Sequence, residues 1–222
     1  MGSTERRERE RDERRRSILT AAEGLFLEKG YSAVTLDELA AHCELAKGTL
    51  YLYFPSKADM LGSIALATIQ DLGDRFQRVL ETCQDPASCL GQMGQQYMEY
   101  HHATRERSGL VELASSRAIQ EQLSPELQAA WGRESGRSIT QLAQALGGCR
   151  AAGLLVEDLD PLEFALVLAG CSMGLIEIAG QCQGMLPLEP AQFVERGWSL
   201  LLSAVSAPGV DLSRSMKDGG PE

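Results

Sequence analysis

The chain has 222 residues, 44% of them hydrophobic and 23% charged. This balance excludes a disordered chain, and the length suits either a small domain with a larger one or a single domain. The formal net charge of −10 at first argues against a nucleic-acid partner. Residues 1–57, however, hold ten basic and ten acidic residues, whereas the other 165 residues hold 11 basic and 21 acidic residues. An acidic body therefore follows a neutral amino-terminal segment, which can still carry a local basic surface.

The amino-terminal residues have no strand-like pattern, and neither has the rest of the sequence, so we expect an all-α fold. Residues 1–13 are densely charged with both signs and are expected to form a flexible arm. Apolar residues at helical spacing then predict a first helix over residues 14–29, which Gly30 ends.

Two capping boxes mark the starts of further helices; in each, a Ser or Thr and an acidic residue three positions later satisfy backbone amides of the first turn. Thr35–Glu38 starts the second helix, and a third covers residues 46–52. Ser56–Asp59 starts a long fourth helix over residues 57–81. Three short helices ahead of a long one predict a helix-turn-helix DNA-binding domain over residues 14–57.

The remaining chain is expected to form one helical domain over residues 58–207, followed by a disordered Gly- and Ser-rich tail over residues 208–222. Several of its helices open with a capping residue before proline, which suits the first helical position. The expected helices cover residues 86–104, 109–121, 125–151, 161–181 and 190–206. The most apolar run, residues 164–176, is too short to span a bilayer and is expected to be a buried helix.

Two stretches resemble a known family. TLDELAA at residues 35–41, followed by AKGTLYLYFPSKADML at residues 46–61, closely resembles the DNA-binding signature of TetR-type repressors. The rest of the chain is similar to that family only in its helical character and length. The resemblance implies a DNA-binding head, a carboxy-terminal domain that binds a small ligand, and a homodimer.

The chemistry of this segment also suits DNA. Gly48 lets the backbone approach a phosphate or base edge, and Lys47 and Thr49 beside it can reach bases or phosphates. The hydroxyls of Tyr51 and Tyr53 suit phosphates, although both rings could instead pack between helices. The expected DNA contacts are Thr35, Lys47, Gly48, Thr49, Tyr51, Tyr53 and Lys57, the last as a phosphate clamp. The expected core beneath them comprises Phe26, Leu39, Leu50 and Phe54.

Two residues depart from the family's pattern. Glu44 stands where the family usually has Gly in the turn, so that either Glu44 has a positive φ, at about 1 kcal/mol, or the turn differs. Ala46 stands where a capping Ser is common, which forfeits roughly 1 kcal/mol of helix capping. We expect weaker DNA binding, or a third helix that settles only on DNA.

The arginines between Arg6 and Arg16 have two interpretations. They belong either to a solvated extension of the first helix or to an arm that follows the DNA backbone or minor groove.

The resemblance further implies a ligand cavity within the larger domain and a dimer interface made by the last two helices. Candidate ligand-binding residues have a polar tip in apolar surroundings: Met93, Tyr97, Tyr100, His101, Trp131, Met173 and Glu177. Glu177 could pair with a cationic ligand or with an arginine at the interface edge. Candidate dimer residues are Gly170, Gly174, Trp198, Leu201, Leu202 and Val205. Each of these residues could instead simply pack within one subunit.

Other chemistry finds little support in the sequence. The chain lacks the common hydrolase, zinc-protease, P-loop and dinucleotide motifs, so we expect no enzyme and no cofactor. His101 and His102 diverge by about 100° on a helix, and no metal site is expected. The six cysteines lack a C-x-x-C pair and no secretory signal is visible, which favours reduced thiols, a cytoplasmic location and no membrane partner.

The sequence thus predicts a ligand-responsive transcriptional regulator, a repressor by resemblance. It would bind a palindromic double-stranded DNA operator as a homodimer and be released by a small-molecule effector. The alternative is a helical interaction protein of the same fold with little or no DNA binding.

Overall fold

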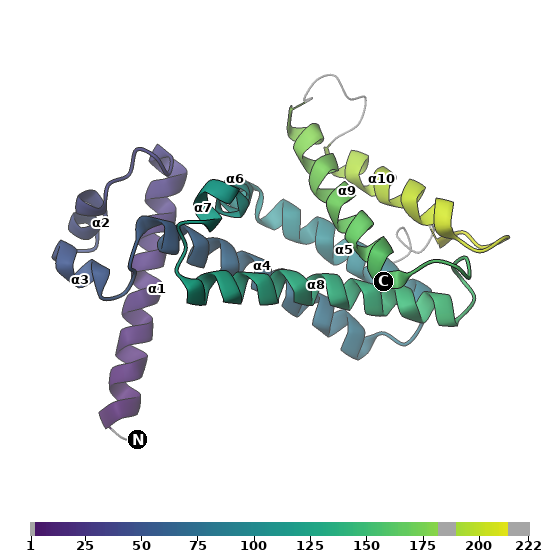
Figure 1. Ribbon diagram of the computed structural model, residues 1–222, viewed down its shortest axis with the longest axis horizontal. Coiled ribbons are helices and arrows are strands. Elements are labelled where there is room, and N and C mark those ends of the chain that lie inside the picture. The colour runs from purple at the N-terminus through teal and green to yellow at the C-terminus, as the bar shows by residue number, and fades with distance from the viewer. Residues whose placement is uncertain (1–2, 182–189, 213–222) are drawn as a thin grey trace. The chain divides into compact units, whose positions relative to one another are not determined.

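The computed structural model describes residues 3–181 and 190–212 (Figure 1). Within these ranges the only strand-like pairing is an isolated bridge between Leu155 and Ser206, so the all-α fold class is confirmed. The helices are α1 (Ser3–Lys29), α2 (Leu36–His42), α3 (Lys47–Tyr51), α4 (Lys57–Thr82), α5 (Pro86–Ala103), α6 (Arg105–Ser115), α7 (Arg117–Gln120), α8 (Pro125–Ala151), α9 (Pro161–Gln181) and α10 (Pro190–Val205).

Most of these helices begin where their capping signals predict. Asp160 Oδ1 accepts the backbone amides of Leu162 and Glu163 at 2.9 Å each, at the start of α9. Asp85 Oδ2 likewise accepts the amide of Ser88 at 2.7 Å, at the start of α5. Each cap satisfies amides that have no partner inside the helix, which fixes the first turn.

Two helix predictions differ from the structure. Residues 3–13 are helical and belong to α1 instead of forming a flexible arm, because Arg and Glu favour helices and Arg6 pairs with Glu10 one turn away. The single helix expected over residues 109–121 is two helices, α6 and α7, because Ser116 between them has an extended backbone.

The described chain forms two compact units. The amino-terminal unit comprises residues 3–69 and 104–133, and the carboxy-terminal unit comprises the other described residues, so α4 and α8 are each divided between the units. The amino-terminal unit extends beyond the boundary expected at residue 57. The start of α4, together with α6 and α7, adds side chains to its core.

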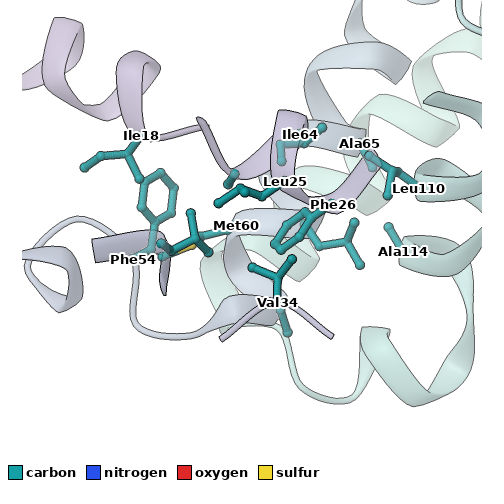
Figure 2. Close-up of a cluster of buried hydrophobic side chains, with 14 of the residues drawn as sticks. Ile18, Leu25, Phe26, Val34, Phe54, Met60, Ile64, Ala65, Leu110 and Ala114 are labelled. Atoms are coloured by element: carbon teal, nitrogen blue, oxygen red, sulfur yellow. The ribbon is translucent and has the colours of Figure 1, made fainter. Parts of the chain in front are cut away.

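The core of the amino-terminal unit lies under the helix-turn-helix (Figure 2). Phe26, Leu39, Leu50 and Phe54 are buried there as expected, with Ile18 and Met60 beside them. Asp59 is also buried, and its Oδ1 accepts the amide and hydroxyl of Ser124 at 3.0 and 2.6 Å. This buried carboxylate joins the start of α4 to the start of α8.

The carboxy-terminal unit is centred on Trp198, whose indole Nε1 donates to Ser172 Oγ at 2.6 Å. Helices α9 and α10 pack side by side (Figure 1) and approach closely at Gly197, where a Cβ would lie 2.4 Å from Leu175 Cδ1. The chain after α10 returns to this unit: Ala207 N donates to Leu154 O at 2.9 Å, and Leu212 is buried, so residues 208–212 do not begin the expected disordered tail. The rest of the expected tail, 213–222, lies outside the described residues.

Helix α9 is less covered than the sequence predicts. Residues Pro161–Ala179 are long and apolar enough to cross a membrane by length and composition alone, a test that core helices of soluble proteins also pass, but only 28% of the stretch is buried. Its inner side, including Phe164 and Leu168, belongs to the core. The outer side exposes large apolar residues: Leu162, Leu166, Val167, Met173 and Ile178.

Candidate nucleic-acid interface

Helix α2 begins with the expected capping box. Thr35 Oγ1 accepts the backbone amide of Glu38 at 3.2 Å, as the motif predicts. The Glu38 carboxylate accepts from Lys29 Nζ at 2.5 Å, and this bond raises the pKa of Lys29 and lowers that of Glu38. A hydrogen bond from the backbone of Thr35 to the same carboxylate lowers the pKa of Glu38 further. Thr35 is thus occupied with the helix start, while its side chain stays at the surface.

The turn between α2 and α3 contains a residue with a positive φ, which was one of the two alternatives expected for Glu44. Glu44 has φ 54°. The amide of Leu45 donates to Ala40 O at 2.8 Å and that of Glu44 to Ala41 O at 3.1 Å, which is the Schellman pattern that ends many helices. The family's usual turn is therefore kept, at about 1 kcal/mol of backbone strain in a residue that is not glycine.

Helix α3 presents one face to solvent. Ala46 precedes it with an extended backbone and gives no side-chain cap. Lys47, Gly48 and Tyr51 are exposed, the Tyr51 side chain at 47%, and Thr49 is half-buried. A Cβ on Gly48 would meet no atom within 4 Å, so nothing in this chain requires glycine there. Leu50, on the opposite face, is buried in the core.

Lys47 is held toward α2 by a carboxylate. Its Nζ lies 2.9 Å from Asp37 Oδ2, and this hydrogen bond raises the pKa of Lys47. Both side chains are exposed, so water and salt screen their attraction. The ammonium is charged and can exchange this carboxylate for a phosphate.

Two of the expected contacts are more enclosed than the rest. Lys57 Nζ donates to Tyr31 O and Val34 O, both at 2.8 Å, and lies 4.3 Å from the centre of the Tyr31 ring. Burial lowers the pKa of Lys57. Lys57 thus ties α4 to the segment before α2, and a phosphate would have to compete with two carbonyls for it. Tyr53 is half-buried against the amino-terminal core.

Four of the seven candidate ligand residues lie together in the carboxy-terminal unit, on α5. The rings of Tyr97 and Trp198 are stacked with centroids 5.3 Å apart, and His101 lies 4.4 Å from Tyr97 and 5.0 Å from Tyr100. Met93 is fully buried beside them. Burial lowers the pKa of His101 to about 4 and raises that of Tyr100 to about 12, so both are neutral at pH 7.

The other three candidates do not join this cluster. Trp131 packs against the core of the amino-terminal unit. Met173, 64% exposed, and Glu177 lie on the outer side of α9. The sequence could not show which of the seven candidates lie together. An apolar helix that is covered on two faces has a residue pattern similar to that of a helix covered on one face.

The candidate dimer residues also divide. Trp198 and Leu202 are buried in their own unit, so they are core residues, and Leu201 and Val205 pack partly on the same core. Gly170 is exposed on the outer side of α9 and Gly174 is half-exposed; a Cβ on either would meet no atom within 4 Å. Other exposed apolar residues of these two helices were not predicted from the sequence: Leu162, Leu166, Val167 and Ile178 on α9, and Leu200 on α10.

Comparison with known proteins agrees with this geometry. Residues 18–64, which run from the buried part of α1 into α4, match the family model for bacterial regulatory proteins of the tetR family. Residues 18–64 therefore resemble a TetR-family N-terminal domain. The whole described helix-turn-helix, including α3, lies within this match.

Similar proteins share mainly this TetR domain. The HTH-type transcriptional activator FasR of Mycolicibacterium smegmatis is 33% identical over 75 residues, 34% of this chain and 34% of that protein. The HTH-type transcriptional repressor KstR of the same species is 39% identical over 67 residues, 30% of this chain and 29% of that protein. The matches to these relatives therefore span about a third of their length.

The fold extends further than the sequence similarity. SmeT, described as the repressor of a Stenotrophomonas maltophilia multidrug efflux pump, is 21% identical to this chain. Its structure aligns over 93% of this chain and 97% of its own with a TM-score of 0.65. Beyond residues 18–64, the carboxy-terminal unit thus has a fold similar to that of the corresponding part of SmeT. In the described part of the chain, no group of three His, Cys, Asp or Glu side chains could hold a metal ion.

Proposed function

We propose that this protein is a transcriptional repressor that binds a palindromic operator as a homodimer and leaves it when a small molecule binds the carboxy-terminal unit. The observation that carries the proposal is the outward face of α3. Lys47, Gly48 and Tyr51 lie there in solvent over a buried Leu50, within a segment that matches the TetR domain.

The chemistry of this face suits the major groove. A lysine can donate to guanine O6 and N7, and the methyl and hydroxyl of Thr49 can contact a thymine methyl or a phosphate. Gly48 leaves space for a base edge or sugar to approach the backbone. Asp37 must release Lys47 for this contact, which sets a modest cost on binding.

The decisive experiment is selection of duplexes from a random library by the full-length protein, followed by binding measurements on the selected sites. We expect two inverted half-sites with centres about 34 Å apart, one DNA turn. Lys47→Ala should weaken the preference, whereas Lys29→Ala, which removes an exposed, carboxylate-paired lysine elsewhere in the unit, should leave it unchanged. Recovery of no preferred sequence at low salt would overturn the proposal.

The outer side of α9 supports the homodimer. Leu166, Val167 and Met173 expose a strip of apolar surface around Gly170, and small residues let helices of two subunits approach closely. Val167→Glu should convert a dimer to a monomer in analytical ultracentrifugation. Leu27→Glu, which charges an exposed leucine of α1, should leave the dimer intact.

The cluster of Met93, Tyr97, Tyr100 and His101 supports an uncharged, largely apolar effector. Its polar atoms are neutral at pH 7, so a charged ligand would lose its hydration without gaining an opposite charge from these four side chains. Trp198 stacks on this cluster and Trp131 does not, so an effector that enters should change the fluorescence of a Trp131→Phe variant and leave that of Trp198→Phe unchanged.

The alternative is a helical interaction protein of the same fold with little or no DNA binding. Glu44 favours it because it adds a negative charge beside the groove-facing helix, and the missing cap at Ala46 adds to this. A promoter–reporter assay with the selected site distinguishes the readings. Repression that depends on Lys47 supports the first, and an unaffected promoter supports the second.

A further inference from the structure

The described part of the amino-terminal half of α1 contributes no buried residue to the core of its unit. Every residue from Glu5 to Ser17 is exposed, and Figure 1 shows this half of α1 continuing beyond α2 and α3. Isolated helices of this length are marginal in water, and packing is what usually stabilises them. Its residues therefore form a surface that is available to a partner.

The arginines of this half are not evenly spread around the helix. Arg7, Arg11 and Arg14 follow each other at spacings of four and three, the spacing of a single stripe. The same stripe continues into Ile18, Ala22 and Leu25, which are buried on the core. We call Arg7, Arg11, Arg14 and the adjacent Arg15 the arginine stripe. Glu10, which flanks it, is already paired with Arg6 at 3.3 Å.

The near end of the arginine stripe lies against the helix-turn-helix. Arg15 places its guanidinium 4.6 Å from the centre of the Phe54 ring and donates to Ser63 Oγ at 3.2 Å. Burial raises the pKa of the Cys43 thiol, in the turn between α2 and α3, and the positive charge of Arg14 opposes that rise. The stripe thus starts between the turn and the residues that follow α3.

The outer arginines are not paired with any described carboxylate, although Glu8 and Glu10 flank them. Among the described residues, Arg7, Arg11 and Arg14 form no ion pair, in contrast to Lys47, Lys29 and Arg6. Arg7 and Arg14 are about 10 Å apart along the helix, a distance over which a DNA strand presents several phosphates. Residues 5–17 hold seven arginines and five acidic residues, so this part of α1 has a net positive charge that complements a phosphate backbone.

We infer that the arginine stripe of α1 binds the phosphate backbone flanking the half-site read by α3, so that each subunit grips DNA outside the bases it recognises. This inference rests on the proposed DNA binding. It adds a second contact surface, which strengthens binding without adding sequence preference, because phosphates are the same at every base pair. These phosphate contacts also offset the DNA affinity lost to the negative charge of Glu44 and to the missing helix cap at Ala46.

The test compares two double variants of the full-length protein that remove the same charge. Arg7→Gln with Arg11→Gln removes the outer stripe, and Arg6→Gln with Arg9→Gln removes two arginines from other sides of the same helix. Glutamine is as good a helix former as arginine, so equal helicity by circular dichroism shows that both variants keep α1. Binding to the selected operator is then measured by fluorescence anisotropy across a salt series.

The stripe variant should bind more than tenfold more weakly at 0.1 M salt. Its log–log salt slope should be shallower by about 3.6, since each of four phosphate contacts per dimer contributes about 0.9. The ranking of operator sequences should not change, and the hydroxyl-radical footprint should be shorter at both ends. The control variant should keep the wild-type footprint and most of the wild-type slope.

Equal losses in both variants would show a general charge effect and overturn the inference, as would unchanged binding. Tighter binding by the stripe variant would mean that the stripe contacts the acidic body of the protein instead of DNA. In these cases wild-type binding that still depends on Lys47 leaves the proposed function standing. Failure of the wild-type protein to bind any duplex overturns the proposed function itself.

Discussion

Lys47 and Tyr51 on α3 stand in solvent above the core of the amino-terminal unit, whereas Tyr97 and Trp198 of the carboxy-terminal unit are the core. Lys47 and Tyr51 bury little surface, so substitutions at these two residues should cost little stability. Substitutions at Tyr97 or Trp198 should cost much more, because both side chains are buried. The two units therefore differ in how function and stability are divided among side chains, and the difference can be measured.

The largest effect is expected at Trp198. Trp198→Ala removes a fully packed ring and leaves Ser172 without its donor, which should lower the free energy of unfolding by about 3–5 kcal/mol. Trp131→Ala, at a half-buried site in the other unit, should cost about 1 kcal/mol. Urea unfolding followed by circular dichroism checks both values. Equal losses would show that the two rings are equally packed.

Acid should weaken the carboxy-terminal unit through His101. Burial lowers its pKa to about 4, below the value near 6.5 in an unfolded chain, so the unfolded state takes up the proton first. Stability should therefore be unaffected by this group above pH 6.5 and fall as the pH drops toward 4, by up to about 3 kcal/mol.

His101→Phe should remove most of that acid dependence, as seen in unfolding midpoints between pH 7 and pH 4.5. His102→Phe is the matched control. The His102 side chain is exposed, so this substitution should leave the acid dependence of stability unchanged. An identical pH profile in wild type and His101→Phe would contradict the assignment.

On α3 the effect should appear in DNA binding alone. Lys47→Ala and Tyr51→Ala should each weaken operator binding by about 1–3 kcal/mol, with unfolding free energies within about 0.5 kcal/mol of wild type. Anisotropy titrations and urea melts on the same preparations measure both quantities. A large loss of stability in either variant would show that the separation of roles fails in the amino-terminal unit.

The smallest effect is expected in the turn. Glu44→Gly relieves a left-handed backbone and should raise the free energy of unfolding by about 1 kcal/mol or less, while removing a negative charge near DNA should tighten operator binding. Glu44→Ala, which removes the charge but keeps the strain, separates the two contributions. Weaker operator binding by both variants would mean that Glu44 makes a contact of its own.

Residues whose role depends on local geometry could be predicted from the sequence. The cap at Thr35, the buried Leu50 and Phe54, and the positive φ as an alternative at Glu44 each follow from a few neighbouring residues. The TetR resemblance added the positions of α3 that we expect to face DNA, because that motif is short and contiguous.

Residues whose role depends on distant partners could not be predicted in the same way. Nothing near Lys57 in sequence indicates that the carbonyls of Tyr31 and Val34 hold its ammonium. Trp198 and Leu166 both lie on apolar helices, and only packing separates the buried ring from the exposed leucine. Residues 3–13 look disordered by charge alone, yet their Arg and Glu content favours a helix.

The return of residues 207–212 to the carboxy-terminal unit has a practical consequence. The amide of Ala207 occupies the carbonyl of Leu154, and Leu212 closes over the apolar residues beneath it. A truncation that stops at the end of α10 would uncover that apolar surface to water and invite aggregation. Affinity handles and fluorescent reporters should therefore be joined downstream of Leu212.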